Sequence, residues 1–101
     1  MTPEGKVKER ITKILKDLGI YYFMPRGTSF GRSGIPDYIC CIDGRFVGIE
    51  AKAGTNKLSA LQKLELSRID AAGGLTYVAN EDNLDNLKFI LEHMVNANRR
   101  E

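Results

Sequence analysis

An Asp-Gly pair at residues 43 and 44 separates two runs rich in β-branched and apolar residues, 36–42 and 45–52. This dipeptide strongly favours a two-residue hairpin turn, because both of its residues tolerate a positive φ. Such a turn places Ile42 opposite Arg45 and thereby sets the register of every pair behind them. Counting back from this pair places Asp37 directly opposite Glu50. The sequence therefore predicts an antiparallel hairpin with two facing carboxylates near its open end.

Other patterns predict helices and strands on both sides of the hairpin. Thr2 is a helix-capping residue in front of a stripe of apolar residues at helical spacing. Ser59 and Gln62 have the spacing of a capping box, which marks the start of a later helix. Together these patterns predict helices over 3–18, 60–72 and 84–95 and additional strands over 20–24 and 75–79.

The predicted order of elements is α-β-β-β-α-β-α, which is typical of an α/β domain with a mixed sheet flanked by helices. The succession of strand, helix and strand over 45–79 implies a right-handed parallel crossover. A chain of 101 residues, of which 43% are hydrophobic, has room for one core, so we expect a single domain over 1–101.

The composition limits where the protein can work, which partners its charge indicates and whether it forms disulfides. No apolar run approaches the roughly 20 residues of a membrane-spanning helix, so we expect a cytoplasmic protein. The net charge of +2 is too small to indicate a polyanionic partner by itself. Cys40 and Cys41 are adjacent in a strand and point to opposite faces, so they cannot form an ordinary disulfide. We expect both to be core residues.

The facing acids need a compensating charge, because like charges directly opposite on antiparallel strands are destabilising. Alternation puts Lys52 on the same face as Glu50, and Gly48 leaves space beside the acids. Mg²⁺ binds through one or two carboxylates together with water and phosphate oxygens, so an ion between Asp37 and Glu50 would relieve the conflict. Lys52 would then orient a water molecule or stabilise charge on a phosphodiester. In the alternative interpretation, Lys52 only pairs with Glu50, and Asp37 caps a turn after Pro36.

Two polar side chains fall on the inward faces of the predicted helices. Glu4 lies on the same stripe as Val7 and Ile11, where it would support the ion or its water. Alternatively, Glu4 complements the helix N-terminus and pairs with Lys8. Gln62 can cap its own helix and also hydrogen-bond a catalytic group or a DNA phosphate; alternatively, the capping box alone explains this glutamine.

The segment 25–34, directly before the acids, is a basic loop that contains three glycines. It supplies cations, hydroxyl groups and backbone amides, which are the groups that hold phosphates. Its alternative interpretation is a solvated connection. The candidate nucleic-acid contacts in this loop are Arg26, Thr28, Ser29, Arg32 and Ser33.

These residues occur in an order that resembles a known family. Gly34-Ile35-Pro36-Asp37, the hairpin, Glu50-Ala51-Lys52 and the step from Leu58-Ser59 to Gln62 resemble the PD-(D/E)XK nuclease superfamily. The closest resemblance is to its virus-type replication-repair nuclease branch, the VRR-NUC domain. It covers nearly the whole chain and implies a restriction-endonuclease-like core, as in the stand-alone domains of phages and bacteria.

The resemblance implies that Asp37, Glu50 and the backbone carbonyl of Ala51 bind Mg²⁺ or Mn²⁺, and that Lys52 is the catalytic lysine. It adds Glu4 and Gln62 to the active-site set. The implied activity is endonucleolytic hydrolysis of DNA. Small stand-alone members are homodimers that act on branched DNA such as Holliday junctions, in replication, recombination or repair, inside a bacterial or phage-infected cell.

Two other interpretations remain open at this point. The first is a non-catalytic nucleic-acid-binding module of a phage replication complex, which keeps the fold without the reaction. The second is a Holliday-junction resolvase of a different nuclease branch, which would share the active site and differ in dimer geometry. Metal-dependent strand scission distinguishes the nucleases from the binding module.

Overall fold

The hairpin lies at the centre of a four-stranded sheet in a computed structural model that describes residues 1–26 and 32–97. The strands lie in the order β1-β2-β3-β4; the first two pairs are antiparallel and β3 pairs with β4 in parallel. This mixed sheet, flanked by three helices, confirms the predicted α/β fold and element order. The elements are α1 (Pro3–Asp17), β1 (Tyr21–Phe23), β2 (Tyr38–Ile42), β3 (Arg45–Ala51), α2 (Ala60–Ala71), β4 (Leu75–Ala79) and α3 (Leu84–Ala97).

The register of the hairpin agrees with the prediction from its turn. Asp43 and Gly44 both have positive φ, 52° and 76°, and Ile42 pairs with Arg45. The paired positions continue to Tyr38 opposite Ile49, where β2 begins. The predicted start of this strand at residue 36 is therefore wrong by two residues. The physical reason is that a side-chain oxygen of Asp37, in place of a backbone acceptor, takes the next N–H group of β3.

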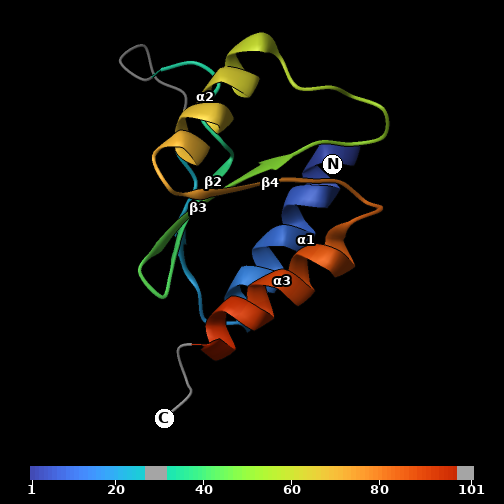
Figure 1. Ribbon diagram of the computed structural model, residues 1–101. Helices are drawn as coiled ribbons and strands as arrows, with labels where there is room; N and C mark the ends of the chain where they lie inside the picture. Colours follow the sequence, from blue (N-terminus) through green and yellow to red (C-terminus); the bar gives the residue numbers. More distant parts are fainter. Residues whose placement is uncertain (27–31, 98–101) are drawn as a thin grey trace.

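The helices form layers on the two faces of the sheet (Figure 1). Helices α1 and α3 lie side by side on one face, and α2 covers part of the other. Thr2 caps α1 by accepting a hydrogen bond from the N–H of Gly5 at 3.0 Å. The predicted capping box of Ser59 and Gln62 is present at the start of α2. Helices α1 and α2 therefore begin where their capping residues predict, although several element ends differ from the predicted bounds by one or two residues.

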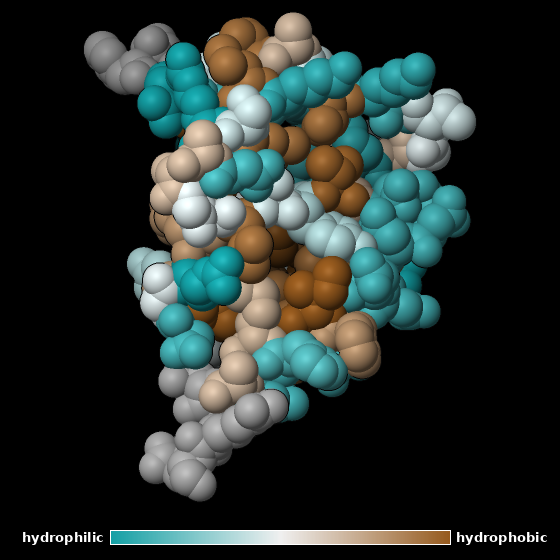
Figure 2. Space-filling view, viewed as in Figure 1, coloured by the Kyte–Doolittle hydropathy of each residue, from teal (hydrophilic) through white to brown (hydrophobic). Residues whose placement is uncertain are grey.

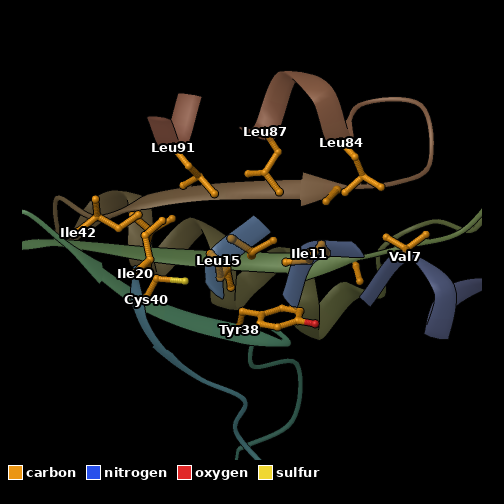
Figure 3. Close-up of a cluster of buried hydrophobic side chains, with 14 residues drawn as sticks. Val7, Ile11, Leu15, Ile20, Tyr38, Cys40, Ile42, Leu84, Leu87 and Leu91 are labelled. Atoms are coloured by element: carbon orange, nitrogen blue, oxygen red, sulfur yellow. The ribbon is translucent and has the colours of Figure 1, made fainter. Parts of the chain in front are cut away.

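The hydrophobic core lies between the sheet and the layer formed by α1 and α3 (Figure 3). The buried stripe of α1 consists of Val7, Ile11 and Leu15, at a spacing of four residues. The leucines of α3 meet these side chains from above the sheet in Figure 3. Cys40 belongs to this core, but Cys41 is exposed, so the prediction of two core cysteines is wrong for Cys41. Alternation along β2 points Cys41 to the opposite face, which α2 does not fully cover there.

Two glycines allow α2 to approach the sheet closely. A Cβ atom on Gly48 would lie 3.1 Å from the side chains of both Ile69 and Pro36. Gly34 has a φ of +85°, and a Cβ atom there would lie 2.5 Å from the backbone of Leu61. A larger side chain at either position would push α2 outward. Gly34 therefore lets the first turn of α2 lie close to the residues just before the hairpin. Gly48 lets the end of the same helix lie close to β3.

Hydrophobic and hydrophilic residues are distributed unevenly over the surface shown in Figure 2. Hydrophilic residues cover most of the outline of this face, and hydrophobic atoms gather along its middle. Four of the five residues of β4, an edge strand, are only partly buried. Within residues 1–26 and 32–97, no helix is both long and apolar enough to cross a bilayer.

Candidate active site

Asp37 and Glu50 lie next to each other at the open end of the hairpin. Asp37 accepts a hydrogen bond from the N–H of Ala51 through Oδ2 at 2.8 Å. Glu50, on β3, is only 3% exposed. Burial, the charge of Asp37 and a hydrogen bond with Asp37 together raise the pKa of Glu50 to about 8. Near neutral pH Glu50 therefore keeps its proton, because the fold holds it beside another acid in a poorly solvated place.

Lys52 follows Glu50 by two residues and lies on the same side of the sheet. Its Nζ atom is 3.8 Å from Oε2 of Glu50, and its side chain is largely buried. The backbone N–H of Lys52 donates to the carbonyl of Ala79 on β4 at 2.9 Å, which continues the parallel ladder past the end of β3. The positive charge of Lys52 lowers the pKa of Glu50 but does not cancel the effects of burial and Asp37. The sheet thus gathers two acids and one buried ammonium group.

Gln62 makes both of the contacts that its position in the sequence allows. Its Oε1 atom accepts from the backbone N–H of Ser59 at 2.9 Å, which completes the capping box. Its Nε2 atom donates to Oε2 of Glu50 at 3.0 Å. Because one partner is a donor and the other an acceptor, the two contacts together set the orientation of the amide. Helix α2 therefore holds one oxygen of Glu50 in place from the face of the sheet that α2 covers.

Glu4 and Lys8 lie above the acids on α1. The Nζ atom of Lys8 is 3.6 Å from Oε2 of Glu4 and 3.4 Å from Oδ1 of Asp37. Burial lowers the pKa of Lys8, but Asp37 and Glu4 outweigh burial and raise the pKa above its ordinary value of 10.5. The pairing of Glu4 with Lys8 that one interpretation predicted is present, and the negative charge of Glu4 also reaches the acid pair, where it raises the pKa of Glu50.

Lys8 is the site residue that the sequence analysis missed as a partner of the acids. The hydroxyl group of Tyr38 donates to the carbonyl of Lys8 at 2.7 Å and shares a hydrogen bond of 2.8 Å with Thr12. These contacts fasten α1 to the start of β2, beside Asp37. The spacing of Glu4 and Lys8 reveals their ion pair, but no local pattern reveals that α1 lies over Asp37.

The structure describes three of the five candidate residues of the basic loop. Arg26 and Ser33 are exposed, and Thr28 and Ser29 lie outside the described residues. Arg32 forms an ion pair with Glu65 of α2, with Nη2 3.3 Å from Oε1. This partner lies about one helical turn beyond Gln62 on α2 and is not one of the paired acids. The interpretation of a phosphate-binding loop stays a prediction.

The donor set at the acid pair fits a single divalent ion of the magnesium type. In the described part of the chain, no three or more His, Cys, Asp or Glu side chains are grouped closely enough to hold a metal. An ion here would rest on the oxygens of Asp37 and Glu50 with main-chain and water oxygens, which is a coordination that Mg²⁺ accepts. A carboxylate has about four acceptor positions, and the contacts described above engage Asp37 with one N–H group, one ammonium group and the carboxyl group of Glu50.

No protein-family model matches this chain, and no curated protein matches it. The resemblance to VRR-NUC nucleases is therefore a prediction from the motif residues and the geometry around them.

The metal-free protein should become less stable as the pH rises from about 5 to about 8. Glu50 has an ordinary pKa of 4.5 and a pKa of about 8 in the folded chain, so the folded state binds more protons between these values. Unfolding then becomes more favourable with each increase in pH across this window. Thermal unfolding in EDTA at pH 5.5 and pH 7.5 measures the effect. Glu50→Gln, which cannot ionise, should show a smaller loss; an equal loss in both proteins would assign the pH dependence to other groups.

Proposed function

We propose that this chain is a divalent-metal-dependent DNA endonuclease of the PD-(D/E)XK superfamily, similar to the VRR-NUC branch. The observation that carries the proposal is the pair of Asp37 and Glu50, which is held together with a buried lysine although burial and mutual repulsion oppose its ionisation. A fold seldom keeps two acids in this state without a use for them, because perturbed pKa values gather at functional sites. A nuclease centre uses all three groups.

The residues that would hold Mg²⁺ or Mn²⁺ are Asp37, Glu50 and the backbone carbonyl of Ala51. The N–H group of Ala51 points to Asp37, and in a strand the carbonyl of the same residue points to the same side. Ala51 is fully buried, and its N–H group lies against Asp37. When bound, such an ion lowers the pKa of a water molecule and polarises a phosphodiester.

The chain's own residues supply the rest of the chemistry. Lys52 presents a compact ammonium group to the space beside Glu50, where it can orient the attacking water and stabilise negative charge on the phosphate. Gln62 holds Oε2 of Glu50, which keeps the carboxylate from turning away when it loses its proton. Lys8 partly neutralises Asp37 and Glu4 and so limits the repulsion around the centre.

We propose branched DNA, such as a Holliday junction, as the substrate and a homodimer as the working form, in replication, recombination or repair. A two-fold axis would place two copies of the site on opposite strands of a symmetric junction. Strand β1 is an edge strand, and its Tyr21 and Phe23 are 72% and 51% exposed. An exposed apolar edge of this kind supports association with a second copy of the chain.

The alternative function, a non-catalytic nucleic-acid-binding module, is favoured by a different observation. In the described part of the chain, every buried side-chain nitrogen and oxygen already has a hydrogen-bond partner without any ion. Lys8 and Lys52 each lie within 4 Å of one of the two acids. A module of this kind would bind DNA in the absence of metal and would never cut it.

The experiment that tests the proposal incubates the purified chain with labelled linear, flap and four-way DNA, with EDTA, Mg²⁺ or Mn²⁺. We expect cleavage only with a divalent ion, and faster cleavage of four-way DNA than of linear duplex. Binding without cleavage under all of these conditions would support the non-catalytic module and contradict the nuclease.

A further inference from the structure

An open cavity of about 350 Å³ lies between the second half of α2 and the sheet. Its volume falls at the lower end of the range for small-molecule sites, about 300–1,000 Å³. It is separate from the acid pair: the residues that line it include Arg32, Phe46, Glu65, Arg68, Ile69 and Gly74. None of the proposed steps of DNA hydrolysis uses these side chains.

The lining of the cavity includes apolar side chains from β3 and α2. Phe46 of β3 is 47% exposed, because its neighbour Val47 takes the position that faces the core. Ile69 of α2 lies beside it, and Gly74 keeps the space close to the backbone: a Cβ atom there would lie 2.7 Å from Ile69 Cγ2 and 3.1 Å from the carbonyl oxygen of Phe46. An aromatic ring with open space in front of it is a stacking surface for another flat ring.

At the rim of the cavity, two guanidinium groups form ion pairs with one buried carboxylate. Glu65 is 6% exposed; its Oε1 is 3.3 Å from Nη2 of Arg32, and its Oε2 is 3.1 Å from Nη1 of Arg68. Each contact engages one nitrogen of an arginine, and a guanidinium group has five N–H donors in all. Both arginine side chains are more than half exposed. Glu65 thus positions a rim with a net positive charge and with donors left for an anion.

We propose that this cavity binds one unstacked nucleotide of the DNA substrate, with the base against Phe46 and the phosphate on Arg32 and Arg68. This inference rests on the proposed function for the identity of the ligand. An exposed aromatic side chain beside two guanidinium groups matches the two parts of a nucleotide, since bases stack on aromatic side chains and phosphates bind arginine.

The position of the cavity along α2 agrees with this ligand. Gln62, which contacts Glu50, and Glu65, which holds the two arginines, are three residues apart on the same helix. At 1.5 Å per residue, they are about 4.5 Å apart along the helix axis. A strand whose phosphodiester lies at the acid pair would therefore bring a neighbouring nucleotide to the cavity. Such a nucleotide must leave the base stack, as it does at a branch point or in a single strand.

The test is a binding experiment in EDTA, so that it does not depend on cleavage. The chain contains no tryptophan, so Phe46→Trp places a single fluorescent ring in the cavity. We expect a single-stranded oligonucleotide to quench this fluorescence strongly and a blunt duplex of the same sequence to quench it weakly. In the matched control Phe89→Trp, the substituted residue is exposed on α3 in the other layer, and its fluorescence should change little.

Two further variants measure the contributions of the base and the phosphate. Phe46→Ala and Arg68→Gln should each weaken binding of the single strand about tenfold, because stacking on one aromatic ring contributes roughly that much. Phe89→Ala and Arg10→Gln, on the layer of α1 and α3, should leave it within about twofold. Binding of the oligonucleotide without quenching in Phe46→Trp, or equal losses in cavity and control variants, would overturn the nucleotide site. Neither result depends on whether the protein cuts DNA.

Discussion

Replacing Lys52 with methionine should slow metal-dependent DNA cleavage by about 10³-fold and leave DNA binding intact. An ammonium group that stabilises transition-state charge in a poorly solvated site contributes on this scale, about 10²–10³-fold. Methionine is unbranched and similar in length, so it fills the buried space that the lysine stem occupies. The rate of single-turnover cleavage measures the effect. Because Lys52 is not a metal ligand in this arrangement, the variant should still bind Mn²⁺.

Lys16→Met is the matched control for this substitution. Lys16 is exposed on α1, and its change removes the same charge from the chain. We expect cleavage by Lys16→Met within about twofold of the wild-type rate, as for most surface substitutions. If Lys52→Met cleaved DNA at the wild-type rate, Lys52 would have no part in the reaction, and its role would be limited to the ion pair with Glu50.

Asp37→Asn should abolish cleavage and weaken Mn²⁺ binding at least about tenfold, while the fold is retained. The side-chain oxygen of asparagine can still accept the N–H of Ala51, so the open end of the hairpin keeps its hydrogen bond. The loss of the negative charge removes one of the causes that raise the pKa of Glu50. Metal-free Asp37→Asn should therefore unfold at pH 8 at a temperature equal to or above that of wild type. Cleavage assays and thermal unfolding in EDTA measure the two effects.

Opposite changes in function and stability would distinguish a functional acid pair from a structural one. If Asp37 had only a structural role, Asp37→Asn would keep the hydrogen bond from Ala51 and spare any cleavage activity. That outcome would contradict the proposed centre. The ion pair with Lys8 does not alter this expectation much, because partly exposed pairs contribute little to stability.

The centre of the fold could be predicted from the sequence because local chemistry determines it. Asp43 and Gly44 specify a turn, the turn specifies a register, and the register brings Asp37 beside Glu50. The two contacts of Gln62 follow from a capping box and from its place on the side of the helix that carries Leu66 and Ile69. Each of these inferences uses residues that are close in sequence or joined by a tight turn.

Features that depend on packing between distant elements could not be predicted in this way. The contact of Lys8 with Asp37 requires the rotation and height of α1 above the sheet, which Tyr38 sets through the backbone of α1. The exposure of Cys41 depends on how far α2 extends over the sheet. The cavity beside Phe46 likewise arises where α2 ends, and no local pattern marks it.

The most direct measurement is calorimetry of Mn²⁺ binding at pH 7 in two buffers that differ in ionisation enthalpy. If Glu50 exchanges its proton for a divalent ion, wild type should release about one proton for each Mn²⁺ bound. Asp37→Asn should show weaker binding and a smaller release of protons. No uptake of Mn²⁺ with or without DNA, or uptake with no proton released, would contradict the assignment of Asp37 and Glu50 as a metal centre.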